Sequence, residues 1–231
     1  MNNLDHLIKT DLGSNVYELH KRTSTIHNGI LVDLGVREGI SSEIMLLNSL
    51  TNNNKVFGVD VDFSPLKNTV KEHQNYTSIL GDSCTIGKTW YQPINCLFVD
   101  TFHIKEQVMC ELYYWYKHVI EGGYIIFHDS NWPNGKYDVY NEIRWDRVEY
   151  GIKEFFNINE LEYEDEFIKS ENYPDSWGMT IITLKNKRDF LFDFKNWNEV
   201  FKKRNELISI FWNKENKGNV TIDLTLSPND I

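Results

Sequence analysis

Four short apolar segments of the sequence each end in residues that can accept a proton or bind a cation. Asp33, Asp60 and Asp100 end three of them, and the pair His128 and Asp129 ends the fourth. A carboxylate accepts hydrogen bonds from hydroxyl groups or binds a divalent cation, and an imidazole takes up a proton near neutral pH. Any one aspartate could instead cap a following helix. Four such ends together favour one site that combines polar binding with acid-base chemistry.

The elements that must position these residues alternate along the chain. The segments Ile30–Leu34, Val56–Asp60, Cys96–Asp100 and Tyr124–Asp129 have the nearly continuous apolar character of strands buried on both faces of a parallel sheet. The stretches between them predict helices at Ser41–Leu50, Pro65–His73 and Ile104–Ile120. This order predicts an α/β fold with a doubly wound sheet. Ligands of such sheets bind beyond the carboxyl ends of the strands, where the polar residues lie.

The rest of the chain predicts a helix, a final pair of strands and an aromatic extension. The helix is expected at Gly151–Phe156, and the strands at Glu160–Phe167 and Gly178–Leu184. Apolar side chains then recur near helical spacing at Trp197, Val200, Phe201, Leu207, Ile208 and Phe211. We expect one domain over residues 1–185, with residues 1–28 as a helical cap. Residues 186–231 are expected to form an extension that packs on the core or on a partner subunit.

A loop with two glycines follows the first predicted strand. Gly35 lets the chain turn sharply and lets a ligand approach the backbone, and Gly39 lets the next helix start close to the strand. Ser41 and the helix N-terminus offer hydrogen-bond donors to an anionic group. The loop lacks the third glycine of the G-x-G-x-x-G dinucleotide pattern, and no Gly-Lys-Ser/Thr follows it as in a P-loop.

The loop resembles the first motif of the class I S-adenosylmethionine-dependent methyltransferases, acidic-x-Gly-x-x-x-Gly, which Asp33 to Gly39 match. The resemblance extends over roughly residues 29–185. It implies S-adenosylmethionine as the cofactor. It also implies a Rossmann-like, doubly wound, mostly parallel seven-stranded sheet with an antiparallel last strand. Asp60, or Asp62 in its place, would hold the ribose hydroxyls, and Gly81–Cys84 would meet the adenine. The cofactor-binding residues implied in this way are Asp33, Gly35, Gly39, Ser41, Asp60, Asp82, Ser83 and Asp100.

Two further segments narrow the resemblance. Phe98–His103 and Glu121–Ser130 are similar to the corresponding parts of small-molecule O-methyltransferases. These include catechol O-methyltransferase, the macrocin O-methyltransferase family and the cephalosporin hydroxylase-like group. Many of these enzymes bind Mg²⁺ at the ends of the fourth and fifth strands of their sheet. The segments Cys96–Asp100 and Tyr124–Asp129 correspond to these strands, so the resemblance implies Asp100, His128 and Asp129 as metal ligands.

The chemistry of methyl transfer suits this set of residues. A hydroxyl group becomes a good nucleophile once it loses its proton, which a bound cation favours and a nearby base accepts. His103 is our first choice for the general base and His128 the second. Since imidazole is a poor ligand for Mg²⁺, three arrangements stay open at this stage. Asp100 and Asp129 hold Mg²⁺ with water, or the site takes Mn²⁺ or another transition metal, or the reaction uses no metal.

The acceptor is expected to be a hydroxylated small molecule, either a sugar or a natural product. Aromatic residues that suit such a ligand, or that pack a lid helix, are Trp132, Tyr137, Tyr140, Trp145 and Tyr150. Tyr173–Trp177 is a second candidate for the rim of the acceptor site. Two alternative functions remain. One is a non-catalytic relative that binds the cofactor or a partner protein, and the other is a nicotinamide-dependent oxidoreductase, against which the missing third glycine counts.

The composition and the charge of the chain restrict the partners and the cellular compartment that we expect. The formal net charge of -10 disfavours nucleic acids and anionic membranes as partners. Cys84, Cys96 and Cys110 lack the spacing of a metal site and are expected to be free thiols. Neither a signal peptide nor an apolar run of the ~18 residues that a membrane span needs is present. We therefore expect a cytoplasmic protein, and the C-terminal aromatic stripe would suit a homodimer.

Overall fold

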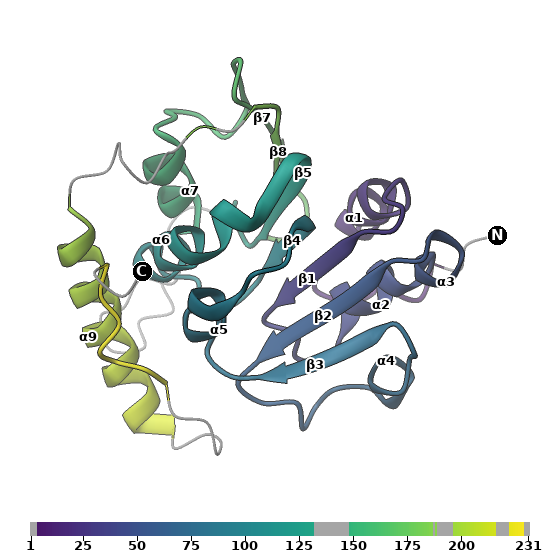
Figure 1. The fold of residues 1–231 in the computed structure, drawn as a ribbon, viewed down its shortest axis with the longest axis horizontal. Helices are drawn as coiled ribbons and strands as arrows, with labels where there is room; N and C mark the ends of the chain where they lie inside the picture. The colour runs from purple at the N-terminus through teal and green to yellow at the C-terminus, as the bar shows by residue number, and fades with distance from the viewer. Residues whose placement is uncertain (1–3, 132–147, 187, 189–195, 216–221, 229–231) are drawn as a thin grey trace.

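Strands and helices alternate along the chain in the computed structural model (Figure 1). The structure describes residues 4–131, 148–186, 188, 196–215 and 222–228, with backbone alone at 211–215. The strands are β1 (Ile30–Leu34), β2 (Lys55–Asp60), β3 (Tyr76–Leu80), β4 (Ile94–Val99), β5 (Val119–His128), β6 (Tyr163–Glu164), β7 (Ile168–Tyr173) and β8 (Met179–Leu184). The helices are α1 (Asn15–Thr23), α2 (Ile40–Leu46), α3 (Ser49–Asn52), α4 (Asn68–Lys71), α5 (Ser83–Thr89), α6 (Lys105–Trp115), the 3₁₀ turn η1 (Tyr116–His118), α7 (Val148–Phe156) and α9 (Trp197–Glu215).

The strands form one mixed sheet in the order β3-β2-β1-β4-β5-β8-β7-β6. Strands β1 to β5 pair in parallel, and the last strand of the chain, β8, runs antiparallel to β5. The predicted α/β class, the mostly parallel sheet and its antiparallel last strand are therefore confirmed. Chain order reverses between β1 and β4, so the carboxyl ends of these two strands border the crevice in which ligands of such sheets bind.

The sheet has eight strands, so the expected number of seven is wrong. The additional strand is β6, which pairs antiparallel with β7. The strand expected at Glu160–Phe167 is also misplaced, because the chain turns there. The Asp165 carboxylate accepts the backbone N–H groups of Phe167 and Ile168 at 2.7 and 2.8 Å, which closes a tight turn between β6 and β7.

Both faces of the sheet are buried. Successive strand residues such as Leu31 and Val32 alternate between two apolar clusters, as the period of a strand requires. One cluster includes residues of α5, α6, α7 and α9, and the other includes residues of the N-terminal segment, α1, α2 and α4. Figure 1 shows α6, α7 and α9 together on one side of the sheet. This double cover explains the nearly continuous apolar sequence of the central strands.

Helix α9 packs on α6 through the apolar stripe. Trp197, Val200, Phe201 and Ile208 are buried. The ring of Phe201 lies 5.1 Å from that of Tyr113 on α6, measured between centroids. The side chain of Phe211 lies outside the described residues. The division of the chain near residue 185 and the presence of a partner subunit stay predictions.

Two other expectations concern the cysteine thiols and the membrane. The thiols of Cys84, Cys96 and Cys110 are free and buried, as expected. Among the described helices, none has both the length and the apolar character needed to cross a membrane.

Candidate active site

A cavity of about 270 Å³ opens at the carboxyl ends of the central strands. Seven of the predicted site residues line it: Gly35, Asp60, Asp82, Ser83, Asp100, His103 and Asp129. A second cavity of about 280 Å³ extends from it towards the N-terminal segment and includes the predicted residue Ser41. Both cavities are lined by Asp11, Gly35, Arg37 and Asp100, so they form two parts of one groove. Asp33, Gly39 and His128 line neither cavity.

Gly35 brings the loop after β1 against the end of β4. Its φ of 84° is in the left-handed region that favours glycine. A Cβ atom at this position would lie 1.9 Å from the backbone carbonyl oxygen of Asp100. The absence of a side chain at Gly35 therefore permits the close approach that places Asp100 at the groove.

The substitution Gly35→Ala is expected to destabilise the fold by roughly 2–4 kcal/mol, because left-handed strain adds to the clash with Asp100. Urea unfolding would measure the loss. Gly122→Ala is the matched control, because Gly122 has a φ of 76° and no atom within 4 Å of an added Cβ. Equal losses in the two variants would contradict the role of close packing at Gly35.

Asp33 lies beneath the groove. Its Oδ2 accepts hydrogen bonds from the hydroxyl groups of Ser41 and Ser42 at 2.7 and 2.5 Å. The carboxyl is fully buried and does not line the cavity. Gly39 caps α2 with a φ of 86°, and an added Cβ would lie 2.7 Å from a methyl group of Leu66. The structure thus places Asp33 and Gly39 where they hold the loop and the start of α2 together.

Burial of Asp33 predicts a dependence of stability on pH. Desolvation raises the pKa of this carboxyl to about 7 from an ordinary value of 3.8, because the hydrogen bonds of the two serines offset burial only in part. A raised pKa favours the protonated form in the folded state. Stability from this group is therefore fully present below the unfolded-state pKa and is lost as the pH rises through about 7.

The variant Asp33→Asn should gain stability relative to the wild type as the pH rises from about 5 to 8, by an amount on the order of a few kcal/mol. Thermal unfolding of both proteins across that pH range gives the difference, in which the titrations of other groups largely cancel. Parallel stability curves would show that the Asp33 carboxyl carries no such penalty.

Asp60 presents its carboxylate to the cavity at the end of β2. Its two oxygens accept the backbone N–H groups of Arg37 and Asp62 at 2.8 and 3.0 Å. The side chain of Asp62 is instead exposed and accepts hydrogen bonds from the backbone N–H and the hydroxyl of Ser64. Of the two candidates for the ribose hydroxyls, Asp60 is the one that lines the cavity.

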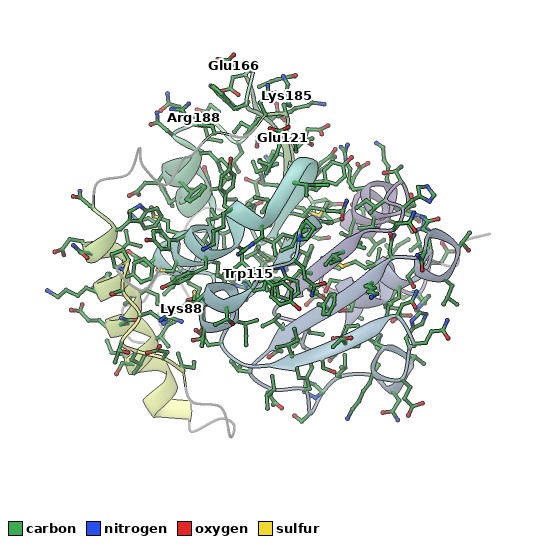
Figure 2. The ribbon with its side chains drawn as sticks, in the orientation of Figure 1. Lys88, Trp115, Glu121, Glu166, Lys185 and Arg188 are labelled. Carbon is green, nitrogen blue, oxygen red and sulfur yellow. The ribbon has the colours of Figure 1, made fainter. Side chains whose placement is uncertain are left out.

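Asp82 and Ser83 line the cavity at the start of α5, but their side chains also contact other protein groups. The Asp82 carboxylate accepts the backbone N–H of Thr85 at 3.0 Å as the cap of α5 and forms an ion pair of 2.6 Å with Arg204. The Ser83 hydroxyl donates to Glu111, and the indole of Trp115 (Figure 2) donates to the Ser83 carbonyl oxygen at 2.9 Å. The cavity wall at this point is therefore fixed by groups from α6 and α9.

Three buried polar residues at this wall, which the sequence did not predict, are Gln107 in its lining and Glu111 and Arg204 behind it. A signal for Arg204 was present. It lies between Phe201 and Ile208 at helical spacing, within the apolar stripe, where a cation must have a buried partner. The partner itself is 122 positions away in the sequence, so the stripe could not identify it.

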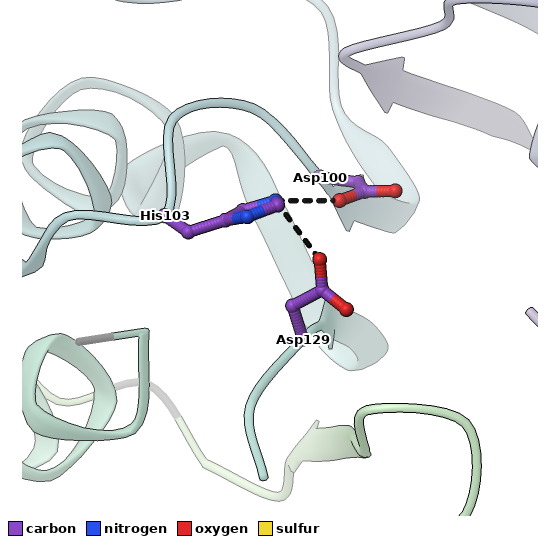
Figure 3. A group of neighbouring side chains, drawn as sticks. All are labelled: Asp100, His103 and Asp129. Atoms are coloured by element: carbon purple, nitrogen blue, oxygen red, sulfur yellow. Dashed lines mark hydrogen bonds and ion pairs between the residues drawn. The ribbon is translucent and has the colours of Figure 1, made fainter. Parts of the chain in front are cut away.

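Four titratable side chains meet at the ends of β4 and β5. The Nε2 of His103 lies 3.1 Å from Asp100 Oδ1 and 3.1 Å from Asp129 Oδ2 (Figure 3). The Nδ1 of His128 lies behind them, 3.4 Å from Asp100 Oδ2 and 3.3 Å from Asp129 Oδ1. Asp129 has a φ of 55°, an uncommon backbone conformation that aspartate tolerates better than most residues. Both predicted base candidates are thus brought to the two aspartates.

Burial and charge perturb the whole cluster. Burial opposes ionisation of Asp100, but the hydrogen bond from His103 and the charges of the two histidines outweigh it and hold the pKa of Asp100 well below its ordinary value. Burial raises the pKa of Asp129 to about 6. Desolvation would lower the pKa of His103 and of His128, but the carboxylates outweigh it, raising both and bringing His128 to about 9. Perturbed groups clustered in a cleft are typical of catalytic and metal sites.

The cluster also fits a divalent cation. One atom each from Asp100, His103 and Asp129 lies within 4.8 Å of the others, which is a spacing at which one ion can meet all three. The buried Asp129 Oδ1 and both ring nitrogens of His128 have no hydrogen-bond partner among the described residues. Two carboxylates suit a hard cation, and the imidazoles extend the choice to Mn²⁺ or another transition metal. The structure adds His103 to the ligand candidates and places His128 beside them.

The candidate acceptor residues are only partly described. Trp132, Tyr137, Tyr140 and Trp145 lie outside the described residues, and Tyr150 is exposed. The Tyr173–Trp177 loop is held by α1, since Asp175 accepts hydrogen bonds from Ser14 and Asn15. Trp177 is partly exposed next to the end of β5, where its carbonyl accepts the N–H of Asn131.

Comparisons with known proteins agree with the fold. Residues 32–130 match the model of a family described as a methyltransferase domain. No curated protein sequence matches the chain at a significant level. The fold is similar to a solved protein from Corynebacterium glutamicum, with 12% identity, coverage of 75% of this chain and 82% of that one, and a TM-score of 0.59.

Two further solved structures have bound ligands. A Podospora anserina methyltransferase with S-adenosylhomocysteine bound matches at 14% identity over 74% of this chain and 76% of that one, with a TM-score of 0.54. MycE, a methyltransferase of the mycinamycin biosynthetic pathway solved with magnesium and S-adenosylhomocysteine, matches at 17% identity over 78% of this chain and 53% of that one, with a TM-score of 0.51. At these identities the likeness concerns the fold.

Proposed function

We propose that this chain, which carries a methyltransferase domain over residues 32–130, transfers the methyl group of S-adenosylmethionine to a hydroxyl group of a small molecule. One observation carries the proposal. A single cavity has the Asp60 carboxylate at the end of β2 and the cluster of Asp100, His103 and Asp129 at the ends of β4 and β5. The first suits the ribose of the cofactor, and the second suits a hydroxyl that must lose its proton.

The groove suggests how the cofactor would lie. Asp60 would accept both ribose hydroxyls, with the adenine towards Gly81 and Ser83. The second cavity would take the amino-acid part, because Lys9 and Arg37 line it and can attract a carboxylate. The methyl group would then lie between these parts, near Asp100, which lines both cavities.

The residues of the cluster would carry the proton chemistry. The acceptor hydroxyl would give its proton to the neutral imidazole of His103 as its oxygen attacks the methyl carbon. The carbon–sulfur bond breaks with its electron pair on sulfur, which leaves S-adenosylhomocysteine, and His103 later releases the proton to water. Asp100 and Asp129, 3.1 Å from this imidazole, would orient it and stabilise its charged form. A divalent cation held by Asp100 and Asp129, with an imidazole, would lower the pKa of the acceptor hydroxyl.

Methyl transfer from radiolabelled S-adenosylmethionine would test the proposal on a panel of hydroxylated sugars and natural products, with Mg²⁺, with Mn²⁺ and with a chelator. We expect label in at least one hydroxylated acceptor and a loss of transfer after chelation. The O-methyltransferase assignment would be contradicted by transfer to nitrogen, sulfur or carbon acceptors alone. Full activity after chelation would remove the metal from the proposal and leave the methyl transfer intact.

One solved structure of similar fold supports a small-molecule acceptor. MycE has also been solved with magnesium, S-adenosylhomocysteine and mycinamycin VI, a small-molecule ligand, at 17% identity to this chain. The acidic net charge of -10 agrees with a small acceptor rather than a nucleic acid.

A further inference from the structure

The cavity wall at Asp82 is held by a residue from the C-terminal helix. Arg204 of α9 is fully buried, and its Nη2 lies 2.6 Å from Asp82 Oδ1. Its Nε donates to Gln107 Oε1 at 3.0 Å. Its remaining donor Nη1 reaches the Asp223 carbonyl oxygen at 2.8 Å and Asn205 Oδ1 at 3.1 Å. Arg204 lies well beyond residues 32–130, which match the methyltransferase domain.

The groups that Arg204 holds are themselves part of the cavity. Asp82 and Gln107 both line it, at the end of the groove next to Gly81 and Ser83. Because Arg204 donates to the Gln107 oxygen, the Gln107 amide must direct its Nε2 the other way, towards Ser83 Oγ at 3.1 Å and Glu111 Oε1 at 2.9 Å. One guanidinium therefore sets both the charge balance and the amide orientation of this wall.

The charge balance is demanding because the wall contains two buried carboxyl groups. Burial raises the pKa of Glu111 to about 7, and Asp82 Oδ1 takes its ion pair from Arg204 alone among the described residues. A buried carboxylate that loses its partner either rearranges towards water or takes up a proton. In this wall, rearrangement would turn Asp82 towards the cavity.

We infer that Arg204 is a positioning residue for the cofactor pocket, so that the C-terminal helix completes the binding site for the adenosine part of S-adenosylmethionine. This inference rests on the proposed function, which places the adenine next to Gly81 and Ser83. Arg204 does not line the cavity, so it acts through Asp82 and Gln107.

The test compares the affinity for S-adenosylhomocysteine and for adenosine by calorimetry in the wild type, Arg204→Gln and Arg204→Lys. We expect Arg204→Gln to weaken the binding of both ligands by the same factor, at least about tenfold, because the disturbed wall contacts the adenosine part that they share. Arg204→Lys keeps the charge, but its ammonium group cannot bond Asp82 and Gln107 at once as the guanidinium does. Its affinity for both ligands should fall by about threefold or more. If Arg204→Gln is insoluble, Arg204→Lys decides the question.

A control separates positioning from stability. Phe201→Leu alters the same helix at a buried ring that packs on Tyr113 and Tyr114 and takes no part in the hydrogen bonds of Arg204. It should lower the melting temperature while keeping wild-type affinity. In a turnover assay, the arginine variants should raise KM for S-adenosylmethionine with little change in kcat.

Three results would count against the inference. Wild-type affinity in a soluble Arg204 variant would overturn it, as would equal weakening in Phe201→Leu. Weaker binding of S-adenosylhomocysteine with unchanged affinity for adenosine would show that Arg204 does not act at the adenosine end of the pocket. Absence of binding by the wild type would instead contradict the proposed function and remove the basis of the inference with it.

Discussion

Replacing His103 by alanine is expected to lower kcat by about 10²- to 10⁴-fold, the usual contribution of a positioned general base. His103 is the histidine that lines the cavity, and its Nε2 contacts both aspartates of the cluster. His128, the second candidate, is buried behind them and does not line the cavity. Affinity for S-adenosylhomocysteine should change little, because the ribose and adenine contacts lie at the other end of the groove.

The pH profile gives a second readout for His103. Its pKa is raised above 6.5, because Asp100 and Asp129 outweigh its burial. A base must be unprotonated, so kcat/KM of the wild type should rise with pH through a range above 6.5. The His103→Ala variant should lack this rise of kcat/KM with pH. His27→Ala, at an exposed histidine, is the matched control and should match the wild type. A His103→Ala enzyme with an unchanged rate across pH would show that His103 is not the base.

The second large effect is expected for Asp129→Asn and Asp100→Asn, each with a loss of kcat of about 10²-fold or more and at least tenfold weaker metal binding. Each change removes a carboxylate charge from the cluster in which Asp100, His103 and Asp129 meet. At Asp129, with its φ of 55°, asparagine also tolerates the left-handed backbone, so the fold should be retained.

Metal affinity and turnover should be measured together for these variants. Titration with Mn²⁺ reports the binding, and the radiolabel assay reports methyl transfer. Asp62→Asn is the control, because Asp62 is an exposed carboxylate near the same edge of the sheet that does not line the cavity. If both cluster variants keep full turnover, the metal-assisted mechanism is wrong. Lost turnover with unchanged Mn²⁺ affinity would assign the carboxylates to orienting His103 instead.

The central strands could be predicted because burial on both faces leaves a clear sequence pattern. β1 has the predicted bounds, and the predicted strands at Val56–Asp60, Cys96–Asp100 and Tyr124–Asp129 overlap β2, β4 and β5. The sequence predicted no bounds for β3, because β3 is an edge strand whose Thr77, Ser78 and Leu80 are exposed. A strand without a buried face on every second residue carries a weak signal.

The candidate site could be predicted where function requires a residue at a strand end. That rule predicted Asp60, Asp100 and Asp129, which line one cavity, and the resemblance to O-methyltransferases added His103. The same rule could not tell a strand-end residue that faces the groove from one that faces the core. Asp33 follows the pattern, yet its carboxyl lies beneath the groove on two serine hydroxyls.

Contacts between distant segments set the remaining limit. The ion pair between Asp82 and Arg204 joins residues on α5 and α9 that no local pattern relates. The extra strand β6 has a similar origin, since two residues are too few for a periodic signal. Such features depend on tertiary packing, which a single sequence does not encode in any local window.

The most direct test of the account is calorimetric titration of the wild-type protein and Asp60→Ala with S-adenosylhomocysteine, with and without Mg²⁺. We expect the wild type to bind in the micromolar range, with or without the metal, and Asp60→Ala to lose at least about tenfold in affinity. Asp60→Ala must keep its fold for the comparison, which its melting temperature would confirm. Absence of binding by the wild type, or equal binding by both proteins, would contradict the placement of S-adenosylmethionine in this groove. Binding of a reduced nicotinamide cofactor in its place would favour an oxidoreductase.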